Sequence, residues 1–171
     1  MPAIISIVGK SGSGKTTLIE KLIPVLKRRG YRIGTIKHAV HGIAVDKEGK
    51  DSWRHKAAGA DTVVLASPEA ISMVKDFKAT VLDDFEKYFD DVDLVITEGF
   101  KTGDKPKIEI YRSSVHKKPL CLDDKDLIAF VTDTTFRSRV PSVGLEDIEK
   151  LADLIEDKFI RVRAPILGVK P

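Results

Sequence analysis

The chain of 171 residues predicts an α/β fold in three layers, with a mixed, mainly parallel sheet flanked by helices. Two observations support this fold class. The β-branched run 3–8 leads through a glycine-rich loop into a helical pattern over 15–29, and further strand-like apolar runs lie at 93–98 and 127–133. A hydrophobic content of 42% is sufficient for one core, so we expect a single domain over 1–160 and a loose tail over 161–171.

The amino-acid composition indicates which kinds of partner and which cellular compartment to expect. The 29 basic and 26 acidic residues nearly cancel, which gives no argument for nucleic acid binding. The single cysteine, Cys121, excludes an internal disulfide and an all-cysteine zinc site, as suits a reducing cytosol. The sequence shows neither a leader-like segment nor an apolar run of membrane-spanning length, so we expect a cytoplasmic protein without a membrane partner.

The segment from Gly9 to Thr16 matches the phosphate-binding pattern GxxxxGK[ST] and lies between a predicted strand and a predicted helix, as that pattern requires. Glycines let backbone N–H groups point at phosphate oxygens, and the helix start adds the positive end of its dipole. We expect Lys15 to reach the β- and γ-phosphates and the Thr16 hydroxyl to ligate Mg²⁺. The motif therefore predicts a P-loop NTPase fold, with nucleotide bound by Gly9, Ser11, Gly12, Ser13, Gly14, Lys15 and Thr16.

Lys10 is compatible with two interpretations. A lysine directly after the first glycine is found in dimerising ATPases, where it reaches the nucleotide of the partner subunit. Here Ser11 follows instead of the usual glycine pair, which favours an exposed loop lysine.

The helix after the loop should run over 15–29, end at Gly30 and be followed by a strand over 31–37, which completes a βαβ unit. Its inner face is expected to hold Leu18, Leu22, Val25 and Leu26. A polar stretch over 37–55 then follows the carboxyl end of a strand, where open α/β sheets bind their ligands.

Several roles remain open for the stretch 37–55. Its candidate functional residues are His38, His41, Asp46, Asp51, Arg54 and His55. The histidines with Asp46 could form a metal site, and Asp46 or Asp51 could hold Mg²⁺ through water. Arg54 with His55 could bind a second anionic ligand. The alternative is a polar surface loop followed by a helix capped by Asp51 or Ser52.

The segment 62–78 contains two predicted strands, 62–66 and 70–74, joined through a turn at Pro68-Glu69. An acidic amphipathic helix is expected over 80–88, with Val81, Leu82 and Phe85 facing inward.

The segment 93–101 resembles a Walker B segment, because a buried strand ends in an acid and a glycine. Glu98 would hold the water shell of the magnesium ion or polarise the attacking water, and the Gly99 N–H would contact the γ-phosphate. Asp93 lies at the wrong end of this strand to take that role.

The last third of the chain contains two predicted strands and a closing helix. The run 106–112 alternates between apolar and polar residues, and 127–133 is predicted as the last core strand. Asp133 follows that strand and could accept hydrogen bonds from N1 and N2 of a guanine. A last helix is expected over 146–159, and its inward-facing residues should be Ile148, Leu151, Leu154 and Ile155.

Five segments together resemble a known family. Over about residues 3–160 the chain is similar to the molybdopterin-guanine dinucleotide biosynthesis protein B (MobB) family. The segments that carry this similarity, in this order and spacing, are GKSGSGKTTL, KHAVHG with Asp46, GKDSWRHKAAGA, DLVITEGFK and PKIEIYR. This resemblance implies a P-loop protein of the same class as nickel-metallochaperone GTPases and dethiobiotin synthetase. It also implies a homodimer that binds GTP with Mg²⁺, hydrolyses GTP weakly and assists the guanylyltransferase partner (MobA) that attaches GMP to molybdopterin.

The resemblance also implies residue roles by position. Gly12, Gly14, Lys15, Thr16 and Thr17 would bind phosphate, Thr16 and Glu98 the magnesium, and Asp133 the base. Lys15, Glu98 and Asp46 are the residues expected to act in hydrolysis, and molybdopterin is a second possible ligand. The stretch from His38 to His55 would be the functional loop particular to the family.

Three other functions remain open. A nickel or zinc metallochaperone GTPase would use His38, His41 and His55, and a small-molecule kinase would hold its acceptor near Arg54. An adaptor could bind nucleotide without needing turnover. Because the sequence contains no Asn and no Gln, it lacks the Asn-Lys-x-Asp guanine motif and a water-orienting glutamine, so any hydrolysis should be slow.

Overall fold

The computed structural model describes residues 2–39, 47–78 and 81–161. The chain forms two compact units, a sheet unit of Met1–His38 with Leu82–Pro171 and a hairpin unit of Ala39–Val81. His41, Asp46 and nearly all of the predicted tail lie outside the described residues. No helix in the described ranges combines the length and the apolar character needed to cross a membrane.

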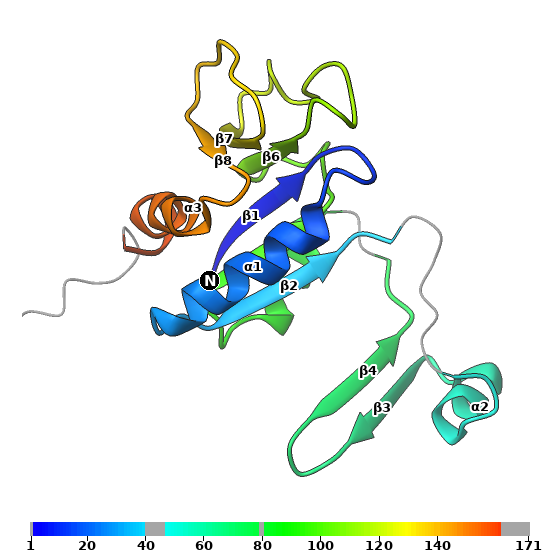
Figure 1. The fold of residues 1–171 in the computed structure, drawn as a ribbon. Helices are drawn as coiled ribbons and strands as arrows, with labels where there is room; N and C mark the ends of the chain where they lie inside the picture. The colour runs from blue at the N-terminus through cyan, green and yellow to red at the C-terminus, as the bar shows by residue number, and fades with distance from the viewer. Residues whose placement is uncertain (1, 40–46, 79–80, 162–171) are drawn as a thin grey trace, which may run out of the picture. The chain divides into compact units, whose positions relative to one another are not determined.

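The sheet unit is built on a six-stranded sheet in the order β2-β5-β1-β6-β7-β8 (Figure 1). Its strands are β1 (Ala3–Val8), β2 (Ile33–Lys37), β5 (Leu94–Glu98), β6 (Lys107–Tyr111), β7 (Leu127–Thr132) and β8 (Ser142–Gly144). All pairings between these neighbours are parallel, which confirms the predicted mainly parallel sheet. The three-residue strand β8 was missed by the sequence prediction, which took 127–133 as the last core strand.

Because the strands are parallel, their carboxyl ends lie at one edge of the sheet. β1 runs between β5 and β6, and Ile7 pairs with Glu98 while Val8 pairs with Glu109. β5 lies between β1 and β2, so the predicted βαβ unit connects strands that are not neighbours. This order places the loop after β1 between the ends of β5 and β6.

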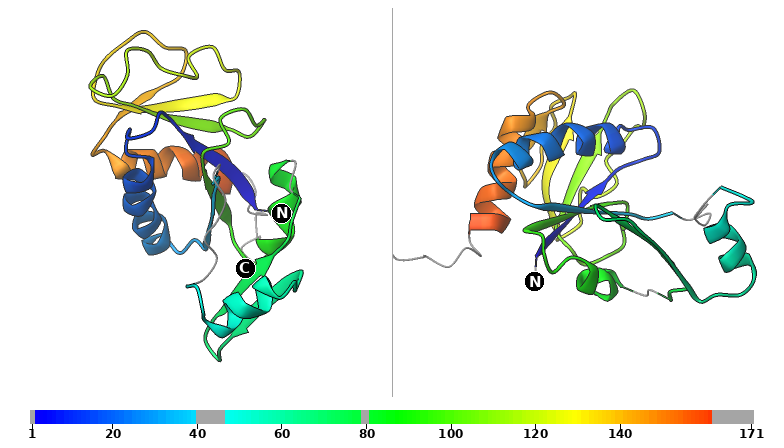
Figure 2. Two further views of the ribbon diagram at one scale, coloured as in Figure 1. Left: turned by 90° about the vertical axis from the view of Figure 1, so that its right-hand side faces the viewer. Right: turned by 90° about the horizontal axis from the view of Figure 1, so that it is seen from below.

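Two helices lie side by side on one face of the sheet (Figure 2). They are α1 (Lys15–Arg28) and α3 (Ile148–Ile155), and α3 continues as the π-helix η2 (Glu156–Ile160). Leu18, Leu22, Val25 and Leu26 of α1 are buried, as predicted, against alternate residues of the strands. In α3 the predicted inner residues Ile148, Leu151 and Ile155 are buried, and Leu154 packs on the same core.

The opposite face is covered by the 3-10 helix η1 (Leu82–Tyr88) and by loops. Leu82 is buried and Phe85 packs beside it, as predicted. Val81 faces outward with 56% of its surface exposed, so its predicted inward position is wrong. Over Leu82–Tyr88 the chain forms a 3-10 helix and not the predicted α-helix.

The hairpin unit contains α2 (Asp51–Ala57), β3 (Thr62–Ala66) and β4 (Ile71–Lys75). The two strands pair antiparallel from Thr62 opposite Lys75 to Ala66 opposite Ile71, which confirms the predicted hairpin. The Ser67 hydroxyl accepts hydrogen bonds from the N–H groups of Glu69 and Ala70 and fixes the turn. The predicted cap is wrong, because α2 is preceded by Lys50 and Asp51 is its first helical residue.

Candidate functional site

The loop after β1 has its tightest point at Gly9. A Cβ atom there would lie 2.6 Å from the Ile110 carbonyl oxygen and 2.8 Å from Ser13 Oγ, so only glycine fits. Gly14 precedes α1 in a left-handed conformation with φ of 98°, which L side chains rarely adopt. The local sequence therefore determines how the loop turns from β1 into α1.

Lys15 folds back over this loop. Its Nζ donates to the carbonyl oxygens of Gly9 and Lys10, each at 3.0 Å. Burial lowers the pKa of this lysine; the Glu98 carboxylate opposes the shift and the Lys37 ammonium adds to it. The result is a partly buried cation inside the loop.

Thr16 and Glu98 meet although 82 positions separate them in the sequence. The Thr16 hydroxyl donates to Glu98 Oε2 at 3.0 Å, and Lys37 Nζ lies 3.6 Å from Glu98 Oε1. A hydroxyl, a carboxylate and two ammonium groups thus converge at the ends of β1, β2 and β5.

Among the other predicted loop residues, Ser13 alone is fully buried, while Ser11, Gly12 and Thr17 are exposed. The Ser13 Oγ atom has no hydrogen-bond partner among the described residues. Gly99 differs from the prediction in one respect: its N–H donates to the Ile7 carbonyl oxygen at 3.1 Å. A contact from this N–H to a γ-phosphate would require that bond to break.

His38 lies at the edge of the same cluster. Its N–H donates to the Glu98 carbonyl oxygen at 3.0 Å, and its ring centre lies 4.8 Å from that of Phe100. Phe100 has a positive φ of 53°, which is uncommon for a residue with a side chain. Among the described residues of the predicted 38–55 loop, His38 is the one that contacts Glu98.

The other described residues that were predicted for that loop lie in the hairpin unit. Asp51, Arg54 and His55 lie on α2 of the hairpin unit, where all three are exposed and line a cavity of about 570 Å³. Arg54 Nη1 lies 3.8 Å from Asp51 Oδ1. Within the parts of the chain that the structure describes, no group of three His, Cys, Asp or Glu side chains is placed to hold a metal ion.

Asp133 lines a cavity of about 720 Å³ at the carboxyl ends of β7 and β8. Its Oδ1 accepts the Ser113 N–H at 3.0 Å. A second cavity of about 90 Å³ lies beside the loop at Ser13, Gly14 and Thr17, and the two cavities share Leu145 and Glu146. The residues after β8 were not predicted for the site, because the three-residue strand before them carries too short a sequence pattern to be recognised.

The donor set fits a magnesium-bound nucleotide. Hydroxyl and carboxylate oxygens are the ligands that Mg²⁺ takes from proteins, usually one or two of them beside waters and phosphates. Thr16 Oγ1 and Glu98 Oε2 supply such a pair next to a lysine and a glycine-rich loop at the start of a helix. A parallel sheet whose central strand ends in this loop defines the class: an α/β protein with a P-loop-like fold.

Known proteins identify the family within this class. The family model of molybdopterin guanine dinucleotide synthesis protein B (MobB) matches residues 4–133. The molybdopterin-guanine dinucleotide biosynthesis adapter protein of Haemophilus influenzae is 42% identical over 157 residues, which cover 90% of this chain and 88% of that protein. The adapter protein of Escherichia coli is 34% identical over 166 residues, with 91% and 92% covered.

A crystal structure of Bacillus subtilis MobB superposes with a TM-score of 0.75 at 27% identity and covers 92% of this chain and 98% of that one. The chain therefore belongs to the MobB family, as the sequence motifs predicted.

Proposed function

We propose that this chain is a GTP-binding adapter in the formation of molybdopterin guanine dinucleotide and that it hydrolyses GTP slowly. The observation that carries the proposal is the contact of Thr16 with Glu98 beside Lys15. The adapter role is supported by the names of the relatives from Haemophilus influenzae and Escherichia coli. The partner we expect is a guanylyltransferase of the MobA type.

Thr16 and Glu98 would hold the magnesium ion, and Lys15 would exchange the Gly9 and Lys10 carbonyl oxygens for phosphate oxygens. Phosphate is the better acceptor for an ammonium group because the bond is charge-assisted on both sides. Bound GTP would supply the phosphate anhydride that is hydrolysed. The sequence has no glutamine to orient the attacking water, so Glu98, which pairs with Lys37 at 3.6 Å, would have to serve both the magnesium ion and that water. Slow turnover is therefore expected.

The guanine would occupy the cavity lined by Asp133, which shares residues with the cavity beside the loop. A carboxylate can accept hydrogen bonds from N1 and N2 of guanine, whereas adenine offers no donors at the equivalent positions. The exposed Arg54 and His55 of α2 would bind an anionic second ligand such as molybdopterin.

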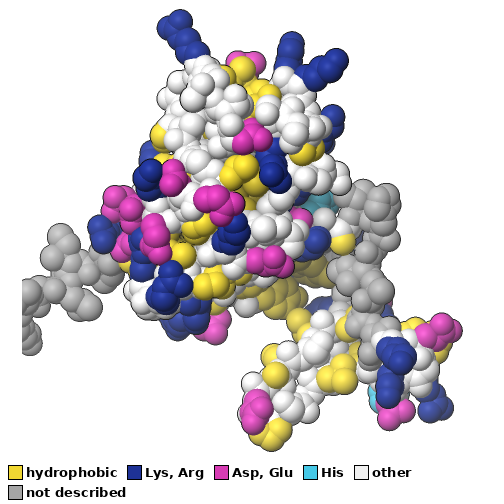
Figure 3. Space-filling model, viewed as in Figure 1, with side chains coloured by type: hydrophobic (Ala, Val, Ile, Leu, Met, Phe, Trp, Pro, Cys, Tyr) yellow, Lys and Arg dark blue, Asp and Glu magenta, His cyan; other side chains and the backbone are white. Residues whose placement is uncertain are grey.

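The proposed homodimer would bury the hairpin unit. Val64, Leu65, Ile71 and Met73 of β3 and β4 expose 44% to 76% of their surfaces, and Figure 3 shows hydrophobic side chains along this hairpin. A two-stranded hairpin in water is marginally stable by itself, so a second copy covering these residues would stabilise it.

Calorimetric titration with GTP and then ATP in the presence of Mg²⁺ tests the nucleotide assignment. We expect GTP to bind at least tenfold more tightly and Asp133→Ala to abolish that preference, because each lost hydrogen bond to the carboxylate is worth about 1.5–3 kcal/mol. Asp123→Ala, which removes an exposed carboxylate, should leave the preference intact. Equal binding of GTP and ATP by the unmodified protein would refute the assignment.

Sedimentation of Ile71→Lys tests the homodimer. This variant should shift the protein to monomer because it places a charge on the proposed interface. Leu122→Lys, at an exposed apolar residue of the sheet unit, should remain dimeric. A monomeric unmodified protein would argue against this interface.

A further inference from the structure

Arg112 follows β6 directly. Among the described residues it is the one arginine whose Nε is buried without a hydrogen-bond partner. It lines the cavity of about 90 Å³ beside the phosphate-binding loop, together with Ser13, Gly14 and Thr17. No carboxylate of the described residues forms an ion pair with its guanidinium. Ser13, whose buried Oγ is also without a partner among the described residues, lines the same cavity.

Two other cations of the sheet unit, Lys107 and Arg29, show how buried or partly buried charges are paired with carboxylates. The nearly inaccessible Lys107 lies 3.0 Å from an Asp124 oxygen and 3.7 Å from an Asp126 oxygen. Arg29 contacts three carboxylates at 2.7 to 2.8 Å. Because an unsatisfied buried donor costs about 1–3 kcal/mol, two residues with unpaired polar atoms around one small cavity indicate a place for a ligand.

The charges around this cavity favour an anion there. Lys21 and Glu146 also line it, but they pair with each other at 2.6 Å and so neutralise one another. The Arg112 charge is then left uncompensated. A nucleotide extending from the loop to the cavity at Asp133 would pass this point with its α-phosphate and ribose, since the two cavities share Leu145 and Glu146.

We propose that Arg112 is a nucleotide-binding residue that donates hydrogen bonds to the α-phosphate. It acts on the side of the loop opposite Glu98 and independently of the magnesium ion. This inference rests on the proposed nucleotide binding and adds a contact that the phosphate-binding motif does not contain.

Titrations of GTP and GDP, in Mg²⁺ and in EDTA, test this role. Arg112→Ala should weaken both nucleotides by the same factor, about 10-fold to 100-fold, because both carry the α-phosphate. The loss should persist in EDTA, whereas the effect of Thr16→Ala should vanish there. Arg112→Lys keeps the charge without the planar fork and should give an intermediate loss. Lys118→Ala, which removes an exposed cation from the same segment, is the matched control.

Two results would overturn the inference separately from the proposed function. The first result is that the unmodified protein binds GTP and that Arg112→Ala and Arg112→Lys bind both nucleotides with affinities within twofold of the unmodified protein. Arg112 would then not contact the α-phosphate. The same holds if Arg112→Ala loses only thermal stability. If the unmodified protein binds neither nucleotide, the proposed function and this inference both fail.

Discussion

Glu109 is a fully buried carboxylate in the middle of β6. Its two oxygens accept the N–H groups of Leu120 at 2.7 Å and Cys121 at 2.8 Å, so one side chain fixes a loop that returns 11 and 12 residues later. The alternation that predicted this strand therefore does not mark a solvent-facing side. The charged residues of β6 are buried and form hydrogen bonds or ion pairs with neighbouring loops.

Glu109→Gln should lower the free energy of unfolding by about 1–3 kcal/mol, because the amide group turns a donor toward one of the two N–H groups. Urea denaturation followed by circular dichroism measures this change. Glu20→Gln on the exposed side of α1 is the matched control and should cost less than about 0.5 kcal/mol. Equal stability of the two variants would contradict the assigned role of Glu109.

Cys121 is 5% exposed, and its burial, with the nearby Glu109 and Asp124 carboxylates, raises the pKa of the thiol to about 11. Only the thiolate reacts with iodoacetamide, so we expect alkylation of the folded protein at pH 7.5 to be far slower than that of the urea-unfolded chain. Mass spectrometry reads the modification directly, since the sequence contains one cysteine. Comparable rates for folded and unfolded protein would be evidence against this buried position.

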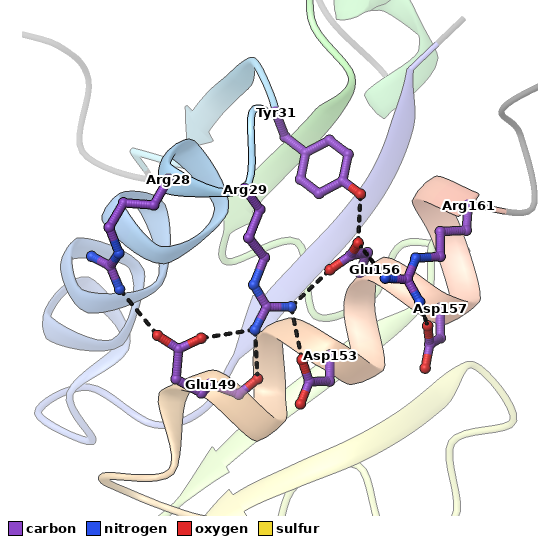
Figure 4. Close-up of polar contacts among 8 residues, drawn as sticks. All are labelled: Arg28, Arg29, Tyr31, Glu149, Asp153, Glu156, Asp157 and Arg161. Atoms are coloured by element: carbon purple, nitrogen blue, oxygen red, sulfur yellow. Dashed lines mark hydrogen bonds and ion pairs between the residues drawn. The ribbon is translucent and has the colours of Figure 1, made fainter.

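At the scale of elements, an ion-pair network joins the end of α1 to α3 and η2 (Figure 4). Arg29 contacts Glu149, Asp153 and Glu156, and the Tyr31 hydroxyl donates to Glu156 Oε1 at 2.7 Å. The hydrogen bonds from Tyr31 and Arg29 lower the pKa of Glu156 below its usual 4.5. This carboxylate is nine-tenths buried, so the solvent screens the network less than an exposed pair.

The network predicts a loss of stability in acid. Since the folded-state pKa of Glu156 is depressed, its contribution is complete above about pH 4.5 and is lost as pH falls through the folded value. Melting temperatures between pH 3 and pH 7 should therefore fall more steeply for the unmodified protein than for Glu156→Gln. The variant should be less stable at pH 7 and approach the unmodified protein near pH 3. Parallel curves would exclude a contribution from this carboxylate.

Elements with a local signal were predictable from sequence, and those set by distant contacts were not. β1, β5 and β7 are continuous apolar runs, as buried parallel strands are, and the β3–β4 hairpin has its turn signal at Ser67-Pro68. The three residues of β8 carry too short a pattern. The outward position of Val81 has no counterpart in the apolar pattern of the segment, which predicted it to face inward.

The residues of the candidate site also fall into a predictable group and an unpredictable group. Lys15, Thr16 and Glu98 belong to motifs that are readable in one segment each. Arg112 and the loop after β8 reach the site only because the strand order brings the ends of β6 and β8 to the same edge. No spacing within the sequence expresses that order.

For the whole molecule, a substitution of Lys15 should abolish nucleotide binding while leaving the fold nearly unchanged. Its side chain makes two hydrogen bonds to loop carbonyls, so Lys15→Ala should cost about 1 kcal/mol or less without ligand. The unmodified protein should melt at a higher temperature in saturating GTP and Mg²⁺, and the variant should show no such shift. Differential scanning fluorimetry compares the two, and Lys27→Ala at the far end of α1 controls for loss of one positive charge. A GTP-dependent shift retained by Lys15→Ala would place the nucleotide elsewhere.

The position of β1 also has a consequence for the time course of synthesis. β1 is made before both of its neighbours, since it pairs with β5 from residue 94 and with β6 from residue 107. At translation rates of about 5–20 residues per second, the apolar run Ala3–Val8 waits roughly 5 to 20 seconds for these neighbours. During that interval it is an unpaired strand that chaperones can bind. The phosphate-binding loop after β1 therefore gains its neighbours β5 and β6 only late in synthesis.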